Sequence, residues 1–119
     1  MRHATQPMLL DLVFAALSDA TRRWLMSRLL DGEATVSDLA EPLQMSLPAV
    51  SKHIRVLEES GIIRRRVEGR VHFITLDVRA FDGVEVWIER MKHFWNARLD
   101  AMERLLKERE KSGGRRGKK

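Results

Sequence analysis

Ser46–Leu47–Pro48–Ala49–Val50–Ser51–Lys52–His53–Ile54–Arg55–Val56–Leu57–Glu58–Glu59–Ser60–Gly61 is the most informative stretch of this 119-residue sequence. Its first serine is a good helix N-cap, a proline at the third position is tolerated in the first turn, and the glycine at its end stops a helix. Val50, Ile54 and Leu57 recur at i, i+4 and i+7, which predicts the buried stripe of an amphipathic helix.

The opposite face of this helix is small, hydroxylated and cationic near its start. It carries Lys52 and Arg55, flanked by Ala49 and Ser51. A helix that enters the major groove of DNA needs such a face, because bulk would clash and donors must reach base edges or phosphates. The pattern therefore indicates contact with double-stranded DNA.

The flanking segments predict a mainly α fold with a small β-hairpin. Helical spacing predicts helices at Met8–Leu17, at Ala20 to about Leu30 after an N-cap at Ser18–Asp19, and at Asp38 to about Leu43 after an N-cap at Ser37, with Val36 as an extended bridge. Trp24 is expected in the core. Downstream, Ile62–Glu68 and Val71–Leu76 predict two strands joined by Gly69–Arg70, and one long helix runs from Val84 to about Glu110. This order is that of a winged helix-turn-helix.

The long C-terminal helix predicts a homodimer. Its apolar residues recur mostly at intervals of three and four along about 40 Å of helix, which is more than so small a domain can cover. The expected dimerisation residues are Leu9, Leu12, Val13, Trp87, Ile88, Met91, Trp95, Leu99 and Met102. The alternative is that this stripe packs only on its own domain.

The net charge of +5 divides unevenly along the chain. Residues 1–110, the expected DNA-binding and dimerisation domain, are neutral overall, and residues 46–70 within them carry +3. All of the net charge belongs to residues 111–119, a basic and Gly-punctuated segment without apolar residues, which predicts a disordered tail. We favour a solvated end over a dedicated binding arm for this tail.

Several classes of protein are excluded or disfavoured. Cysteine is absent, so disulfides, thiolate zinc sites and thiol catalysis are excluded. There is no phosphate-cradling G-x-x-x-x-G-K and no H-E-x-x-H, so we expect no enzyme, no catalytic residues and no cofactor. No apolar run approaches the roughly 20 residues of a transmembrane helix. A cytoplasmic protein without a membrane partner is expected.

Two segments resemble the ArsR-type (arsenic-repressor-like) bacterial transcriptional regulators. Leu17–Ser18–Asp19–Ala20–Thr21–Arg22–Arg23–Trp24–Leu25–Met26 resembles the family's opening L-x-D-x-T-R-x-x-I-L. Leu47 to Ile63 resembles its recognition helix, Q-x-A-V-S-x-H-L-x-x-L-x-x-A-G-L-V. The resemblance covers about residues 10–106. It implies a homodimer that binds an imperfect inverted repeat and represses transcription, usually by occluding polymerase.

Carried over by position, the resemblance implies two groups of DNA contacts. The recognition-helix candidates are Ser46, Ala49, Ser51, Lys52, His53 and Arg55, and the wing candidates are Arg65, Arg66 and Arg70. His53 lies at the border of the buried stripe, so a packed histidine that donates to the backbone is an equal alternative. For the wing arginines the alternative is a solvated hairpin. Asp19, Thr21 and Arg22 are expected to cap the second helix, with a first-turn contact on the phosphate side at best.

The chain departs from the family at its metal sites. Glu33–Ala34–Thr35–Val36–Ser37–Asp38–Leu39 resembles E-L-C-V-C-D-L, but hydroxyls stand where both thiolates would be and cannot replace them for soft metals. The family's other site needs D-x-H with a further pair of ligands on the last helix. In Asp82–Gly83–Val84 a valine stands where that histidine would be. We expect no metal site, and the chain resembles a cysteine-free subgroup.

Two questions stay open from the sequence. Phe94 and Trp95 could line a small-molecule pocket, but aromatic residues at helical spacing are more often core, so any effector is unknown. A winged-helix module that binds proteins is the rival function, because fold alone does not fix function. The cluster of cations on one side of a neutral body argues against this rival, because a protein-binding module does not need it.

Overall fold

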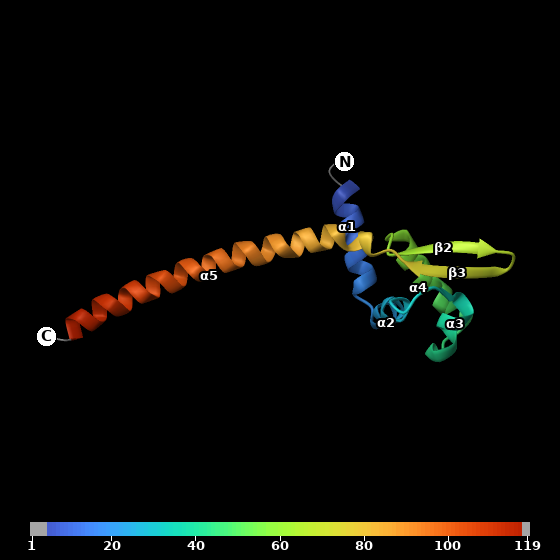
Figure 1. The fold of residues 1–119 in the computed structure, drawn as a ribbon, viewed down its shortest axis with the longest axis horizontal. Helices are drawn as coiled ribbons and strands as arrows, with labels where there is room; N and C mark the ends of the chain where they lie inside the picture. Colours follow the sequence, from blue (N-terminus) through green and yellow to red (C-terminus); the bar gives the residue numbers. More distant parts are fainter. Residues whose placement is uncertain (1–4, 118–119) are drawn as a thin grey trace. The chain divides into compact units, whose positions relative to one another are not determined.

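The computed structural model describes the backbone of residues 5–117 and the side chains of residues 9–113. Its elements are the helices α1 (Thr5–Leu17), α2 (Ala20–Leu29), α3 (Val36–Ala40), α4 (Leu47–Glu59) and α5 (Asp82–Gly117), the strands β1 (Ala34–Thr35), β2 (Ile63–Glu68) and β3 (Val71–Leu76), and the 3-10 turns η2 (Glu41–Leu43) and η3 (Val78–Phe81) (Figure 1). They form two compact units, residues 1–84 and 85–119, which we describe separately. The architecture is the predicted winged helix-turn-helix with a long C-terminal helix.

Local signals set the boundaries of α2 and α4. The carboxylate of Asp19 accepts a hydrogen bond from the backbone N–H of Arg22 at 3.0 Å and caps α2. Ser46 Oγ accepts from the N–H of Ala49 at 3.3 Å and caps α4. Gly61 follows α4 with φ +81°, a left-handed conformation that favours glycine. All three predicted boundary signals are confirmed.

The start of α3 differs from the prediction. Thr35, not Ser37, is its N-cap: Thr35 Oγ1 accepts from the N–H of Asp38 at 3.0 Å, and the Asp38 carboxylate accepts from the N–H of Thr35 at 3.4 Å. This reciprocal capping box leaves Ser37 inside the first turn. Ser37 has a favourable residue type for a cap, but only Thr35 has an acidic residue three positions later.

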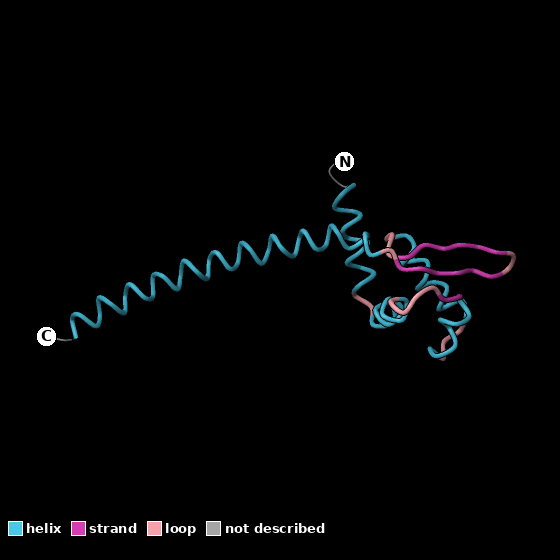
Figure 2. Tube along the Cα trace, in the orientation of Figure 1, coloured by secondary structure: helices cyan, strands magenta, loops and turns pink. Residues whose placement is uncertain are grey.

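The hairpin belongs to a three-stranded antiparallel sheet with the order β1-β3-β2 (Figure 2). In β2 and β3, Arg65 pairs with Ile74 and Arg66 with Phe73, and the turn is made at Gly69, which has φ +61°. Strand β1 adds Ala34 opposite Ile74. The sequence predicted the hairpin but only an extended bridge at Val36; the strand lies immediately before that residue.

One core joins α1 to α4, the sheet and the start of α5. Its largest fully buried side chains are Leu25, Leu39, Val50, Ile54, Leu57, Ile62 and Ile74. The predicted stripe of α4 is therefore confirmed. Trp24, which we predicted to be core, is 37% exposed, because Leu25, Met26 and Leu29 form the buried face of α2.

The last helix is longer than predicted. It begins at Asp82 and continues to Gly117, past the predicted end near Glu110. Its described side chains from residue 85 to 113 are all exposed. Lys118 and Lys119 of the predicted tail lie outside the described residues. Within residues 5–117, no helix has the length and apolar character to cross a membrane.

Candidate nucleic-acid interface

The outer face of α4 carries two cations without internal partners. Lys52 and Arg55 are exposed, and neither makes a side-chain hydrogen bond or an ion pair within the described part of the chain. Ala49 and Ser51 lie beside them, half buried, and Ser46 caps the helix. The backbone N–H groups of the first turn add partial positive charge at the same end. This face can therefore offer donors to phosphates and base edges.

The wing, which consists of β2 and β3, has fewer unpaired cations than its arginines suggest. Arg65 binds Glu58 through two hydrogen bonds, Nε to Oε2 at 3.3 Å and Nη2 to Oε1 at 3.1 Å, and its Nη1 lies 2.9 Å from Nδ1 of His72. Arg64 donates to Asp77 at 2.7 Å. Two of the arginines of the hairpin are therefore neutralised by carboxylates outside it.

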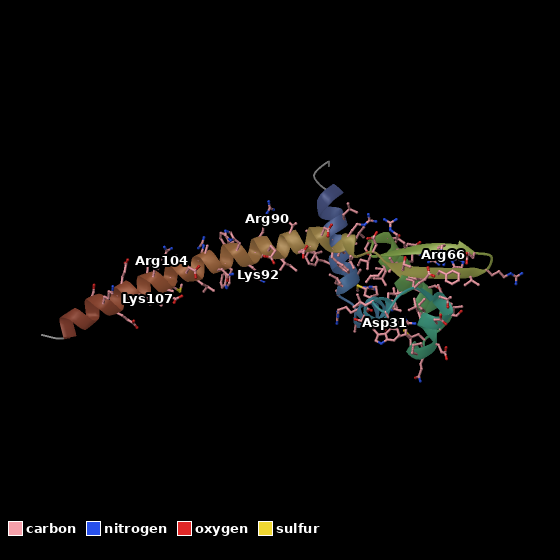
Figure 3. The ribbon with its side chains drawn as sticks, in the orientation of Figure 1. Asp31, Arg66, Arg90, Lys92, Arg104 and Lys107 are labelled. Carbon is pink, nitrogen blue, oxygen red and sulfur yellow. The ribbon has the colours of Figure 1, made fainter. Side chains whose placement is uncertain are left out.

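Arg66 is held by two carboxylates and a ring. Its guanidinium lies 2.9 Å from Glu33 and 2.9 Å from Glu68, and 4.3 Å from the centroid of Phe73. Hydrogen bonds to Glu68 and Glu33 raise the pKa of Arg66 above its ordinary value. Figure 3 places Arg66 on the hairpin, and its partner Glu33 precedes β1.

Arg70, at the tip of the wing, differs from these three arginines. It is exposed and makes no hydrogen bond or ion pair to any residue that the structure describes. Of the predicted wing contacts, the structure therefore leaves Arg70 available and pairs Arg65 and Arg66 internally. Which of them touch DNA stays a prediction.

A groove of about 560 Å³ separates the start of α4 from the wing. It is lined by Thr35, Val36, Ser37, Leu47, Ser51, Ile54, Arg65, Arg70, Val71 and His72. Its walls therefore combine hydroxyls from α4 and the start of α3 with two arginines from the wing. Phosphate oxygens accept hydrogen bonds from both kinds of donor.

His53 is packed rather than projected outward. Nη1 of Arg22 lies 3.1 Å from its Nδ1, and a guanidinium can only donate, so Nδ1 is the acceptor. The same arginine donates to the carbonyls of Ala16 and Ala15 at 3.0 and 2.9 Å. The guanidinium of Arg22 therefore makes three hydrogen bonds within the protein. The partner of His53 is a side chain, where the packed alternative had expected the backbone.

The acidic partners of the arginines in the wing are not predicted from the sequence. Glu33, Glu58 and Asp77 decide which arginines are available. A signal for Glu58 was present, because Gly61 turns the chain back directly after α4 and brings β2 alongside its last turn. Nothing local pointed to Glu33, which is far from Arg66 in the sequence.

Of the predicted dimerisation residues, all but one are exposed. Leu9 and Leu12 of α1 are exposed, as are Trp87, Ile88, Met91, Trp95, Leu99 and Met102 of α5. Val13 is only 4% exposed and belongs to the core of its own chain, so it is not available to a partner. Its position one residue after Leu12 turns it to the inner face of α1.

The two positions of the family's thiolates have a different use here. Thr35 caps α3 through its hydroxyl, and Ser37 is exposed in the first turn. Among the described side chains, those of residues 9–113, the structure brings together no group of three or more histidine, aspartate or glutamate residues that could hold a metal ion.

Comparison with known proteins identifies the family. The family model described as bacterial regulatory protein, arsR family, matches residues 19–65. The HTH-type transcriptional regulator Rv2034 of Mycobacterium tuberculosis is 32% identical over 96 residues, which make up 81% of this chain and 87% of that protein. The crystal structure of the ArsR family transcriptional regulator RHA00566 is 43% identical, with a TM-score of 0.73 over 76% of this chain and 93% of that one.

A more distant structure supports the fold alone. It is the homodimeric winged helix-turn-helix DNA-binding domain of a possible ArsR-family regulator from Mycobacterium bovis, 23% identical with a TM-score of 0.61, covering 78% of this chain and 88% of that one.

The relatives are named as transcriptional regulators, and this chain is likewise a regulator with a winged helix-turn-helix DNA-binding domain, not an enzyme. The chain belongs to the arsR family of bacterial regulatory proteins.

Proposed function

We propose that the protein is a homodimeric, cytoplasmic repressor that binds an inverted-repeat operator in double-stranded DNA. The observation that carries the proposal is the pair of exposed, internally unpartnered cations Lys52 and Arg55 on the outer face of α4. In this arrangement α4 enters the major groove, Ser46, Ala49 and Ser51 approach the bases or the backbone, and Arg70 reaches the flanking phosphates. We propose repression rather than activation because the family resemblance implies it.

The homodimer is supported by the exposed apolar face of α5. Ile88, Met91, Trp95 and Met102 fall at intervals of three, four and seven, and all are exposed in the single chain. A stripe of this length needs a second surface, and a two-fold dimer supplies it without another protein. The domain from Mycobacterium bovis is itself described as homodimeric. Two copies of α4 would then read half-sites about 34 Å apart.

Titration of a promoter duplex at several salt concentrations tests DNA binding. The affinity of wild-type protein should fall steeply with salt, and Lys52→Ala should reduce the salt slope by about 1, since each lost phosphate contact removes about 0.9. Lys107→Ala is the matched control, because Lys107 is an exposed cation on α5 that pairs with Glu103. Weak binding without salt dependence would favour the rival protein-binding module.

Sedimentation tests the dimer. Wild-type protein should sediment at about twice 13.8 kDa. Trp95→Glu should give a monomer, while Leu30→Glu should not, because Leu30 is an exposed leucine outside the stripe. A wild-type monomer at micromolar concentration would contradict the two-fold operator. Sequencing of captured DNA would supply the half-site and its spacing, and a reporter behind that site would show repression or activation.

A further inference from the structure

Two arginines of the wing line the same groove but differ in what they bind. Arg65 and Arg70 both face the groove between α4 and the hairpin. The family resemblance implies DNA contacts for both. Their charges are equal, so any difference in function must come from their partners.

All three guanidinium nitrogens of Arg65 are engaged within the protein. Nε, Nη1 and Nη2 all lie within hydrogen-bond distance of internal partners, which are Glu58 on α4 and His72 on β3. Its side chain is 25% exposed, and that of Glu58 is 39% exposed. The pair therefore joins the end of α4 to both strands of the wing through charge-assisted hydrogen bonds.

Arg70 has the opposite character. It is exposed at the turn of the hairpin and makes no hydrogen bond or ion pair to the side chains that the structure describes, those of residues 9–113. Ser51, on the α4 side of the same groove, lies one helical position from Lys52. Of the two arginines that line the groove, Arg70 is therefore available to a ligand, and Arg65 is bound to Glu58 and His72.

We propose that Arg65 is a positioning residue that sets the wing against α4, and that a strand of the DNA backbone runs along the groove in contact with Arg70 and Ser51. This inference rests on the proposed DNA binding and assigns different roles to two arginines that the sequence does not separate. Glu58 acts through Arg65 and touches no DNA. The opposite view is that Glu58 masks Arg65. In that case Arg65 would exchange Glu58 for a phosphate when DNA binds.

Lysine substitutions distinguish these roles. Lysine keeps the charge and can still bind a phosphate, but it cannot make the bidentate bond to a carboxylate together with a third bond to His72. Arg65→Lys and Arg65→Gln should therefore weaken duplex binding by a similar factor, about 3- to 10-fold, with the salt slope unchanged. Arg70→Lys should keep the affinity within about 3-fold, whereas Arg70→Gln should reduce the slope by about 1.

Glu58→Gln gives a test of sign. If Glu58 holds Arg65 in place, the variant binds DNA more weakly than wild type; if it masks Arg65, the variant binds more tightly. Tighter binding by Glu58→Gln, or a slope reduced by about 1 in Arg65→Gln with affinity retained in Arg65→Lys, would overturn the proposal. Glu58 is partly exposed, so this variant keeps the test decisive even if the Arg65 variants unfold.

Amide hydrogen exchange without DNA separates this inference from the proposed function. Arg65→Lys and Glu58→Gln should speed exchange in residues 63–76, and Arg70→Gln should not. If wild-type protein binds no duplex, but Arg65→Lys and Glu58→Gln still speed exchange in residues 63–76, the proposed DNA binding fails while the positioning role of Arg65 holds. Unchanged exchange in both Arg65→Lys and Glu58→Gln would overturn that role.

Discussion

Nη1 of Arg22 lies 3.1 Å from Nδ1 of His53, so the first turn of α2 is bonded to the middle of α4. The same guanidinium donates to the carbonyls of Ala15 and Ala16 near the end of α1. The carboxylate of Asp19 caps α2 by accepting a hydrogen bond from the backbone N–H of Arg22. This hydrogen bond lowers the pKa of Asp19. One side chain thereby joins three helices and fixes α4, which carries the proposed DNA contacts.

Arg22→Ala should lower the free energy of unfolding by about 1–3 kcal/mol. The substitution removes the arginine donor from the carbonyl of Ala16 and from the imidazole of His53, and an unmade bond at a partly buried site carries that cost. Urea unfolding measures it. Arg23→Ala is the matched control, because Arg23 makes one exposed hydrogen bond to the carbonyl of Leu17. Equal losses for the two variants would contradict the joining role of Arg22.

Thr35→Ala should destabilise the protein by about 1 kcal/mol, the usual cost of losing a helix N-cap. Ser37→Ala should change the stability by less than about 0.5 kcal/mol, since Ser37 is exposed and makes no side-chain hydrogen bond in the described part of the chain. Thermal unfolding of the two variants compares them directly. A larger loss for Ser37→Ala would restore the cap that the sequence predicted.

Gln44→Gly should stabilise the protein by up to about 1 kcal/mol. Gln44 ends the turn before α4 with φ +51°, a left-handed conformation that penalises a side chain, although the added flexibility of glycine offsets part of the gain. Gly61→Ala is the converse variant. It places a side chain at φ +81° and should lower the free energy of unfolding by about 1 kcal/mol. Denaturant midpoints that move in the same direction for both variants would refute this account.

Asp77→Asn should make stability less dependent on pH in acid. Hydrogen bonds from Arg79 and Arg64 hold the pKa of Asp77 well below its ordinary value of 3.8. A depressed pKa in the folded state contributes stability that is complete above the unfolded pKa and is lost as the pH falls toward the folded one. The variant should thus be less stable than wild type at pH 7 and lose less on acidification to about pH 3.

Melting temperatures at the two pH values check this prediction. Asp31→Asn is the control, because Asp31 is an exposed carboxylate without an ion pair in the part of the chain that the structure describes, on the segment after α2 (Figure 3). A wild-type profile as flat as that of Asp77→Asn would show that the two arginines do not act through Asp77.

The elements that the sequence predicted well are those with local signals. Ser46 and Gly61 bound α4, and Val50, Ile54 and Leu57 give its buried face, because capping and periodicity act within a few residues. The errors arose where two local signals competed or where burial decided. Thr35 displaced Ser37 through its bond with Asp38, and Trp24 lies beside the stripe that the core selected on α2.

For the candidate interface, the sequence by itself determined where the cations lie: on one face of α4 and along one hairpin. Only the tertiary structure decided which of them are available, because ion pairs depend on distances in space. Glu33 reaches Arg66, and Glu58 reaches Arg65, across separate elements, while Lys52, Arg55 and Arg70 meet no carboxylate among the described residues. Charge is a property of each residue, but its neutralisation belongs to the fold.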